Sequence, residues 1–206
     1  MKQGLYVFSH LDNMEDIIEL SQVVSLEKQE EIKKMITNTV DFEWHWKPTL
    51  AQNTPDTNPT YVDAPGFAHV FYNDHGITMP ETYNTVLDVP IEAFKKASIS
   101  WNKMRYARSF FQLPLTTHSG MSNPHVDMPG EDHWVCLYYI KDADGDTVFF
   151  DKFNEHPNDT LYYEEYNVVK SVSPKQGNAV VFNGRRYHAN VLPRENTRFI
   201  LNFNVQ

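Results

Sequence analysis

Hydrophobic residues recur three or four positions apart in the first part of the chain, a spacing that predicts helices. Between residues 13 and 39 the pattern predicts two helices. Ser25 is the candidate N-cap of the second helix, because its side-chain oxygen can accept a hydrogen bond from the first turn. A further helix is expected over residues 90–104, with Pro90 near the first turn, where proline is favoured. These segments form an expected N-terminal helical layer.

From residue 106 onward, short apolar runs alternate with turns, which is typical of strands. The expected strands are residues 106–115, 134–140, 147–151, 168–172, 179–182, 187–192 and 198–205. Between the second and third of them, Asp144-Gly145 predicts a tight hairpin, and the proline-rich residues 53–65 predict an irregular loop. Short strands at this spacing indicate a sandwich or jelly roll.

The expected fold is therefore mainly β with N-terminal helices. Residues 1–105 form a helical and loop region that packs on the barrel, and residues 106–206 form the β core. A sheet has to bury one face, and the helices are the available cover. We expect one compact domain overall.

Charge and composition exclude some classes of partner. The chain carries 18 basic and 27 acidic residues, a net charge of -9, and no run of Lys and Arg, so we expect no nucleic acid partner. No apolar stretch reaches the length of a membrane span, and the start lacks the pattern of a signal peptide. The single cysteine, Cys136, cannot form an internal disulfide. We expect a soluble cytoplasmic protein without a membrane partner.

The first candidate metal-ligating residues along the chain are His125 and Asp127. On an extended strand, residues two apart point to the same side, so these two side chains can bind one metal ion. His188 is the candidate third ligand, far along the chain. Two histidines and one carboxylate on one face of an octahedron leave three positions open, which is the ligand set of non-haem Fe(II) oxygenases. His-x-Asp alone also occurs by chance in polar surface loops.

Arg198 adds weight to this interpretation. It begins the last expected strand, among largely apolar neighbours, and a charged group in such surroundings needs a partner. Arginine binds carboxylates through a planar, two-pronged contact. The partner of Arg198 is either a dicarboxylate cosubstrate or an acidic residue of the protein, unless the side chain points to solvent.

In order and spacing, His125, Asp127, His188 and Arg198 resemble the 2-oxoglutarate and Fe(II)-dependent oxygenase superfamily, most of all its prolyl-hydroxylase-like branch. The resemblance covers roughly the last hundred residues. It implies a double-stranded β-helix, a cupin-like jelly-roll barrel with the metal near one mouth. It also implies Fe(II) and 2-oxoglutarate as cofactors, with ascorbate as a candidate reductant.

The resemblance extends to the strand expected after His-x-Asp, residues 135–140, where a tyrosine of that branch helps to hold the cosubstrate carboxylate. Tyr139 is the best match. Many oxygenases carry Ser or Thr two residues after the arginine, whereas this chain has Ile200, so Tyr139 would have to serve instead. The presence of Asp127 separates the chain from the related halogenases, which lack the carboxylate ligand.

Three more residues are candidates for contact with the substrate: Arg186, Tyr138 and His133. Arg186 lies just before the distal histidine and is either substrate-facing or an exposed loop arginine. His133 follows the His-x-Asp motif and is either substrate-facing or structural.

The function that the resemblance implies is hydroxylation of a small-molecule or peptide substrate, with release of succinate and CO₂. One alternative is a keto-acid-independent cupin metalloenzyme, which would leave Arg198 without a role. Another is a non-catalytic jelly-roll binding module, which the intact ligands and Arg198 disfavour. The sequence indicates neither the substrate nor the oligomeric state.

Overall fold

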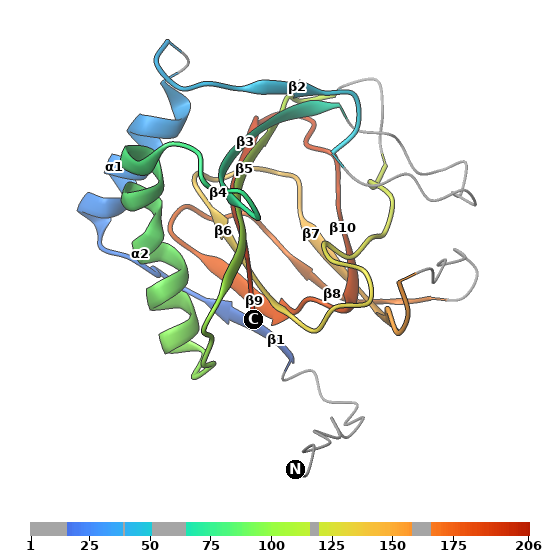
Figure 1. Ribbon diagram of the computed structural model, residues 1–206. Coiled ribbons are helices and arrows are strands. Elements are labelled where there is room, and N and C mark those ends of the chain that lie inside the picture. The colour runs from blue at the N-terminus through green and yellow to red at the C-terminus, as the bar shows by residue number, and fades with distance from the viewer. Residues whose placement is uncertain (1–15, 39, 51–64, 116–119, 158–165) are drawn as a thin grey trace, which may run out of the picture.

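A computed structural model describes residues 16–38, 40–50, 65–115, 120–157 and 166–206 (Figure 1). Within these residues, two helices and eleven strands follow one another. In order they are β1 (Ile17–Leu20), α1 (Leu26–Thr37), β2 (His45–Lys47), β3 (Gly66–Asn73), β4 (Gly76–Ile77), α2 (Pro80–Lys96), β5 (Met104–Gln112), β6 (Trp134–Tyr139), β7 (Thr147–Phe153), β8 (Val168–Val172), β9 (Ala179–Asn183), β10 (Arg186–Asn190) and β11 (Arg198–Val205).

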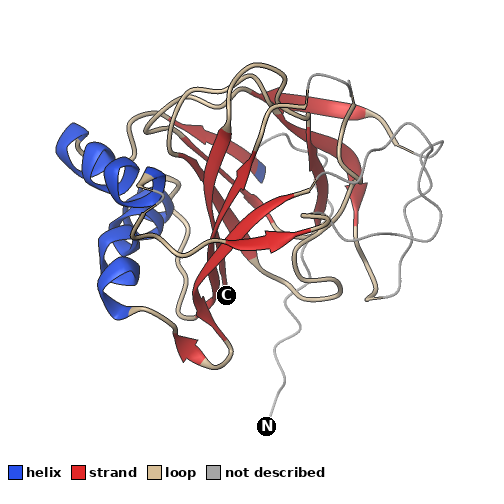
Figure 2. Cartoon of the chain, turned by 90° about the horizontal axis from the view of Figure 1, so that it is seen from above, coloured by secondary structure: helices blue, strands red, loops and turns tan. Residues whose placement is uncertain are grey.

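The strands form two antiparallel sheets. The larger sheet has eight strands in the order β1-β9-β6-β11-β5-β3-β2, with β4 paired to β3, and the smaller sheet has the order β10-β7-β8. Helices α1 and α2 lie together on one side of the larger sheet, and the smaller sheet lies on its other side (Figures 1 and 2). The larger sheet is therefore the middle of three layers, and β11 is one of its inner strands.

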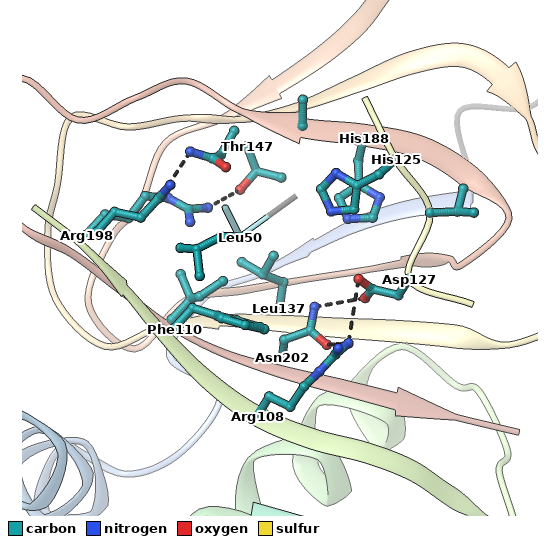
Figure 3. A pocket seen from close by; sticks show the side chains of 15 residues that line it. Leu50, Arg108, Phe110, His125, Asp127, Leu137, Thr147, His188, Arg198 and Asn202 are labelled. Atoms are coloured by element: carbon teal, nitrogen blue, oxygen red, sulfur yellow. Dashed lines mark hydrogen bonds and ion pairs between the residues drawn. The ribbon is translucent and has the colours of Figure 1, made fainter. Parts of the chain in front are cut away.

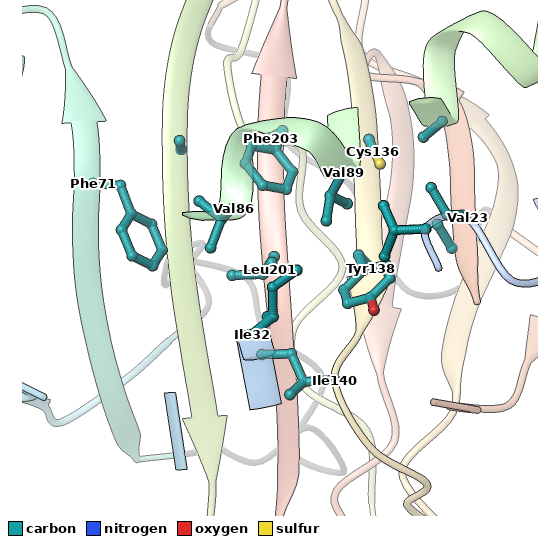
Figure 4. Close-up of a cluster of buried hydrophobic side chains, with 14 of the residues drawn as sticks. Val23, Ile32, Phe71, Val86, Val89, Cys136, Tyr138, Ile140, Leu201 and Phe203 are labelled. Carbon is teal, nitrogen blue, oxygen red and sulfur yellow. The ribbon is translucent and has the colours of Figure 1, made fainter. Parts of the chain in front are cut away.

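Alternation along the inner strands divides the core in two. Tyr138, Leu201 and Phe203 point to the helices, in a core that α1 and α2 complete (Figure 4). Tyr139 and Ile200 point to the other side, where they belong to a smaller core between the two sheets. Because side chains alternate across a strand, β11 presents its even-numbered residues to the space between the sheets.

Two of the helix predictions need correction. The first expected helix is wrong, since Ile17–Leu20 forms the edge strand β1, which pairs with β9. The second helix is confirmed as α1, and the Ser25 hydroxyl oxygen accepts a hydrogen bond from the backbone N–H of Lys28 at 3.2 Å.

The expected helix over residues 90–104 is also misplaced. Helix α2 begins at Pro80 and ends at Lys96, so Pro90 lies inside the helix rather than in its first turn. Ser98 follows with a φ of 57°, which a right-handed helix does not allow, and this residue ends the helical path. Pro90 is buried on the face of α2 that covers the sheet.

All seven expected strands are present, but the hairpin prediction is wrong. Strands β6 and β7 belong to different sheets, so Asp144-Gly145 lies in a connection between sheets. The Asp144 carboxylate accepts hydrogen bonds from the backbone N–H groups of residues 194–196. A Cβ at position 145 would lie 2.7 Å from the carbonyl oxygen of Val191, so glycine is required here by a close approach of the backbone.

The N-terminal residues contribute more than helices, since β1, β2, β3 and β4 all join the larger sheet. The expected loop at residues 53–65 lies outside the described residues except for its last position. Within the described ranges, no helix is long and apolar enough to cross a membrane.

Candidate metal centre and cosubstrate pocket

A cavity of about 100 Å³ lies between the two sheets. Its wall includes side chains from β5, β6, β7, β10 and β11 and from the segment that carries His125 and Asp127. His125, His188 and Asp127 gather at one end of it, and Arg198 lies at the other end (Figure 3). Apolar side chains, among them Leu137, separate the two polar ends.

Backbone pairing brings the two candidate histidine ligands together. His125 forms an isolated antiparallel bridge with His188, in which each backbone N–H donates to the other residue's carbonyl oxygen, at 2.9 and 3.0 Å. Their ring centroids are 4.6 Å apart. The candidate ligand atoms of His125, Asp127 and His188 all lie within 4.8 Å of one another. The three residues that the sequence selects therefore converge on one point.

The histidine rings are oriented for metal binding through Nε2. The Nδ1 atom of His125 lies 2.9 Å from the carbonyl oxygen of Asn123, and that of His188 lies 3.3 Å from the carbonyl oxygen of Arg186. A proton on Nδ1 makes each contact a hydrogen bond and leaves the Nε2 lone pair free. Burial, followed by the neighbouring His125 ring, lowers the pKa of His188 to about 3, so this ring is neutral at physiological pH.

Asp127 is held in its ionised form. Burial alone would raise the pKa of its carboxyl group, but Arg108 and the two histidines keep that pKa well below its usual range. The guanidinium of Arg108 lies 3.6 Å from Oδ1. Two imidazole nitrogens and one carboxylate oxygen, with the rest of the coordination sphere open, suit a divalent cation such as Fe(II).

Arg198 is a buried cation that forms no ion pair with the described residues. It is 4% exposed, its Nε donates to the carbonyl oxygen of Gly145 at 2.8 Å, and its Nη2 donates to Oγ1 of Thr147 at 2.9 Å. In the part of the chain that the structure describes, no acidic side chain forms an ion pair with it. The two protein-only explanations of Arg198, an acidic partner or exposure to solvent, thus find no support. A buried charge of this kind favours an anionic ligand.

Tyr139 lies behind the pocket rather than in its wall. Its hydroxyl donates a 2.9 Å hydrogen bond to Oγ1 of Thr147, and it does not line the cavity. Burial raises the pKa of Tyr139 to about 12, so the hydroxyl remains a donor. Thr147 does line the cavity. Since its oxygen already accepts from Tyr139 and Arg198, its own hydroxyl proton is available to a ligand.

Gln112 offers a second donor beside Arg198. The two residues are paired across β5 and β11. The carbonyl oxygen of the Gln112 side chain accepts from Asn190 at 2.9 Å, but its Nε2 is buried without a hydrogen-bond partner among the described residues. An unsatisfied buried donor in a pocket wall is costly unless a ligand or water meets it.

The three residues expected to face substrate do not line the cavity. Tyr138 is next to Leu137 on β6 and, by alternation, points into the helix-side core. Arg186 forms an ion pair with Asp16 at 2.9 Å.

His133 is likewise buried away from the cavity wall, with its Nδ1 2.8 Å from the carbonyl oxygen of Glu131. Its ring packs directly against Gly184, where a Cβ would clash with it. This contact favours the structural alternative for His133.

Five polar residues of this region are not among the candidates that the sequence offers: Arg108, Gln112, Thr147, Asn202 and Asn204. A signal for some of them exists in the sequence. On β11, Asn202 and Asn204 share the alternation of Arg198 in an otherwise apolar strand, so the three polar residues are predicted to share one face.

No protein-family model matches the sequence, and no curated protein matches it significantly. Solved structures, however, match most of its length. An oxidoreductase of the 2OG-Fe(II) oxygenase family from Burkholderia pseudomallei is 13% identical, with a TM-score of 0.62 over 93% of this chain and 85% of that one.

Two other similar structures differ in their activities. A prolyl hydroxylase from Trichoplax adhaerens, in complex with a hypoxia inducible factor peptide fragment, is 11% identical, with a TM-score of 0.61 over 94% of this chain and 84% of that one. The non-heme alpha ketoglutarate dependent epimerase SnoN from nogalamycin biosynthesis is 9% identical, with a TM-score of 0.60 over 93% and 78%. At such identities the likeness establishes the fold. The chain has the double-stranded β-helix of these oxygenases, as the sequence predicts.

Proposed function

We propose that this protein is an Fe(II)- and 2-oxoglutarate-dependent dioxygenase that hydroxylates a small molecule or a peptide. The observation that carries the proposal is the buried Arg198, which has no ion-pair partner in the described part of the chain and lies at the opposite end of the cavity from the candidate metal ligands (Figure 3). A molecule that bridges these two ends needs a carboxylate at one end and metal-binding oxygens at the other. 2-Oxoglutarate has both.

The donors around the cavity fit this pair of ligands. His125, Asp127 and His188 would hold Fe(II) through two imidazoles and one carboxylate oxygen. The far carboxylate of the keto acid would receive hydrogen bonds from Arg198, from the Thr147 hydroxyl and from the Gln112 amide, whose Nε2 otherwise has no partner in the described chain. Each buried polar atom of this end would then be satisfied.

Bound Fe(II) and keto acid would supply the oxidation. O₂ would be reduced by two electrons from 2-oxoglutarate, released as succinate and CO₂, and by two from a substrate C–H bond, which would become C–OH. The protein would position the keto acid and the substrate, and it would exclude water from them. Phe110, Leu137 and Ile200 line the cavity between its polar ends, and these apolar walls strengthen the ionic contacts at both ends.

The keto-acid-independent cupin alternative would leave Arg198 buried without an anion, which is unfavourable. A non-catalytic module has no evident need for two imidazoles whose Nε2 atoms are free beside an ionised Asp127. For the substrate, the related structures support both a peptide, bound by the prolyl hydroxylase, and a small molecule, as in nogalamycin biosynthesis.

An anaerobic titration tests the proposal. Protein loaded with Fe(II) is titrated with 2-oxoglutarate while the visible spectrum is recorded, because chelation of the keto acid to Fe(II) produces a weak charge-transfer band. We expect the band in the wild type, its absence in His125→Ala, and its appearance in Arg198→Ala only at much higher keto acid. Arg194→Ala, at an exposed arginine of the loop before β11, is the matched control and should behave as the wild type.

The other outcomes of this titration would support one of the two alternative functions. Iron binding without the band would support the keto-acid-independent enzyme. Absence of iron binding in the wild type would support the non-catalytic module.

A further inference from the structure

Asn202 and Asn204 are buried amides next to the candidate metal centre. They are 4% and 0% exposed, and they extend the polar face of β11 that begins with Arg198. A buried amide is unfavourable unless its donor and acceptor are both satisfied. Their hydrogen-bond partners therefore indicate what these two residues do.

Both amides donate to the same carboxylate oxygen. Nδ2 of Asn202 lies 2.9 Å from Oδ2 of Asp127, and Nδ2 of Asn204 lies 2.8 Å from the same atom. One carboxylate oxygen has two lone pairs, so Oδ2 is saturated by these two donors. Oδ1 accepts no hydrogen bond from either amide and lies 3.6 Å from Nη2 of Arg108, beyond hydrogen-bond distance. It is therefore the oxygen of Asp127 that remains for a metal.

Arg108 fixes the orientation of the two amides. Its Nη2 donates to Oδ1 of Asn204 at 2.8 Å and lies 3.5 Å from Oδ1 of Asn202. A guanidinium can only donate and an ionised carboxylate can only accept. Arg108 lies on one side of the amides and Asp127 on the other. Each amide therefore has a single orientation that satisfies both, with its oxygen toward Arg108 and its Nδ2 toward Asp127.

We propose that Asn202 and Asn204 are positioning residues that hold Asp127 as a metal ligand through one oxygen only. The proposal rests on the proposed metal site. A carboxylate that binds through both oxygens would occupy one of the positions that a chelating keto acid and O₂ require. The two amides oppose this, because binding through Oδ2 would break at least one buried hydrogen bond. They also set the direction of Oδ1 relative to His125 and His188.

The test measures metal binding without turnover. Metal-free protein is titrated with Mn(II), and the bound fraction and the water-proton relaxation rate are recorded for the wild type, Asn202→Leu, Asn204→Leu and the double variant. Leucine keeps the shape of asparagine and removes its donor. Loss of an outer partner of a metal ligand typically weakens metal binding about 10- to 100-fold, so we expect about 10-fold for each single variant and more for the double variant.

The relaxation rate distinguishes a change in how Asp127 binds the metal from a loss of folded protein. With three protein ligands, an octahedral Mn(II) has about three positions for water, and binding through a second carboxylate oxygen removes one of them. We therefore expect the inner-sphere relaxation per bound Mn(II) to fall by about one third in the double variant. Loss of affinity through unfolding would not change this quantity for the ion that is still bound.

Gln112→Leu is the matched control, because it removes a buried amide of the same pocket that does not contact Asp127. It should leave Mn(II) affinity and relaxation unchanged. If the double leucine variant does not fold, Asn202→Ser and Asn204→Ser replace it, since serine is too short to reach Oδ2. Wild-type affinity and relaxation in these variants, or an equal change in Gln112→Leu, would overturn the positioning role. Failure of the wild type to bind Mn(II) would instead overturn the proposed function.

Discussion

The guanidinium of Arg198 donates a 2.9 Å hydrogen bond to the hydroxyl oxygen of Thr147, and this contact joins the two sheets. Arg198 begins β11 in the larger sheet, and Thr147 begins β7 in the smaller one. The Gly145 carbonyl, two residues before Thr147, accepts from the same guanidinium. The proposed keto-acid anchor is thus built where the chain crosses between sheets, and its geometry depends on both.

Replacement of Thr147 by valine tests this anchor. Valine keeps the β-branched shape but removes the hydroxyl that Tyr139 and Arg198 both contact. We expect the Kd for 2-oxoglutarate to rise about 10- to 100-fold, since a lost hydrogen bond to a charged group is worth about 1.5–3 kcal/mol, while Mn(II) affinity stays the same. The charge-transfer titration measures the first and Mn(II) titration the second. Thr85→Val on α2 is the control. An unchanged keto-acid Kd in Thr147→Val would show that Thr147 does not bind the keto acid.

Tyr139→Phe distinguishes a direct contact from an indirect one. The resemblance to prolyl hydroxylases suggests that Tyr139 touches the cosubstrate, whereas its hydroxyl reaches the cavity only through Thr147. We therefore expect Tyr139→Phe to raise the keto-acid Kd less than Thr147→Val does, in the same titration. An effect of Tyr139→Phe that equals or exceeds that of Thr147→Val would favour the direct contact.

The sequence predicts the strands of the C-terminal half well because their signal is local. Apolar and aromatic residues between turns are sufficient for that purpose. Pairing between strands is not local, and Asp144-Gly145 shows the consequence. The chain bends at Asp144, but β6 pairs with β9 and β11 instead of β7. A turn signal alone therefore does not identify which strands pair.

The candidate site likewise contains residues that local sequence identifies and residues that it does not. His125 and Asp127 are two residues apart, and such a pair can be recognised from strand geometry alone. Asn202, Asn204 and Gln112 acquire their roles from residues on other strands. Only their alternation on buried strands is visible in the sequence. The first expected helix failed for a related reason, because Ile17–Leu20 is a strand only through its pairing with β9.

Gln112→Leu should weaken the keto acid specifically. The Nε2 atom of Gln112 is buried without a partner in the described chain and lies in the wall of the cavity beside Arg198. Removal of this donor should raise the Kd for 2-oxoglutarate by roughly 5- to 10-fold, the effect of about one hydrogen bond. The free energy of unfolding of the metal-free protein should change little, because loss of the hydrogen bond from Asn190 to Oε1 offsets removal of the unsatisfied Nε2. A keto-acid Kd equal to that of the wild type would argue that Nε2 meets water instead.

The lowered pKa of His188 predicts how the free energy of unfolding of the metal-free protein depends on pH. Burial, with the nearby His125 ring, lowers the pKa of His188 from 6.5 to about 3. Between these two values the unfolded chain binds a proton at this side chain and the folded chain does not. The contribution of His188 is therefore complete above about pH 6.5 and is lost as the pH falls toward 3, by at most about 1.4 kcal/mol per pH unit.

Denaturant unfolding at about pH 7 and about pH 5, with a chelator present, measures this loss. In this range the carboxyl of Asp127 stays ionised, because its pKa lies well below the usual value. Between the two pH values the wild type should lose up to about 2 kcal/mol more of its free energy of unfolding than His188→Gln, whose amide does not titrate. Histidines away from His188 contribute equally to both proteins, so the difference reports His188 together with its interaction with His125 and His133. An equal loss in the two proteins would mean that His188 is protonated in the folded state at pH 5, and its ring would then be a poor metal ligand at that pH.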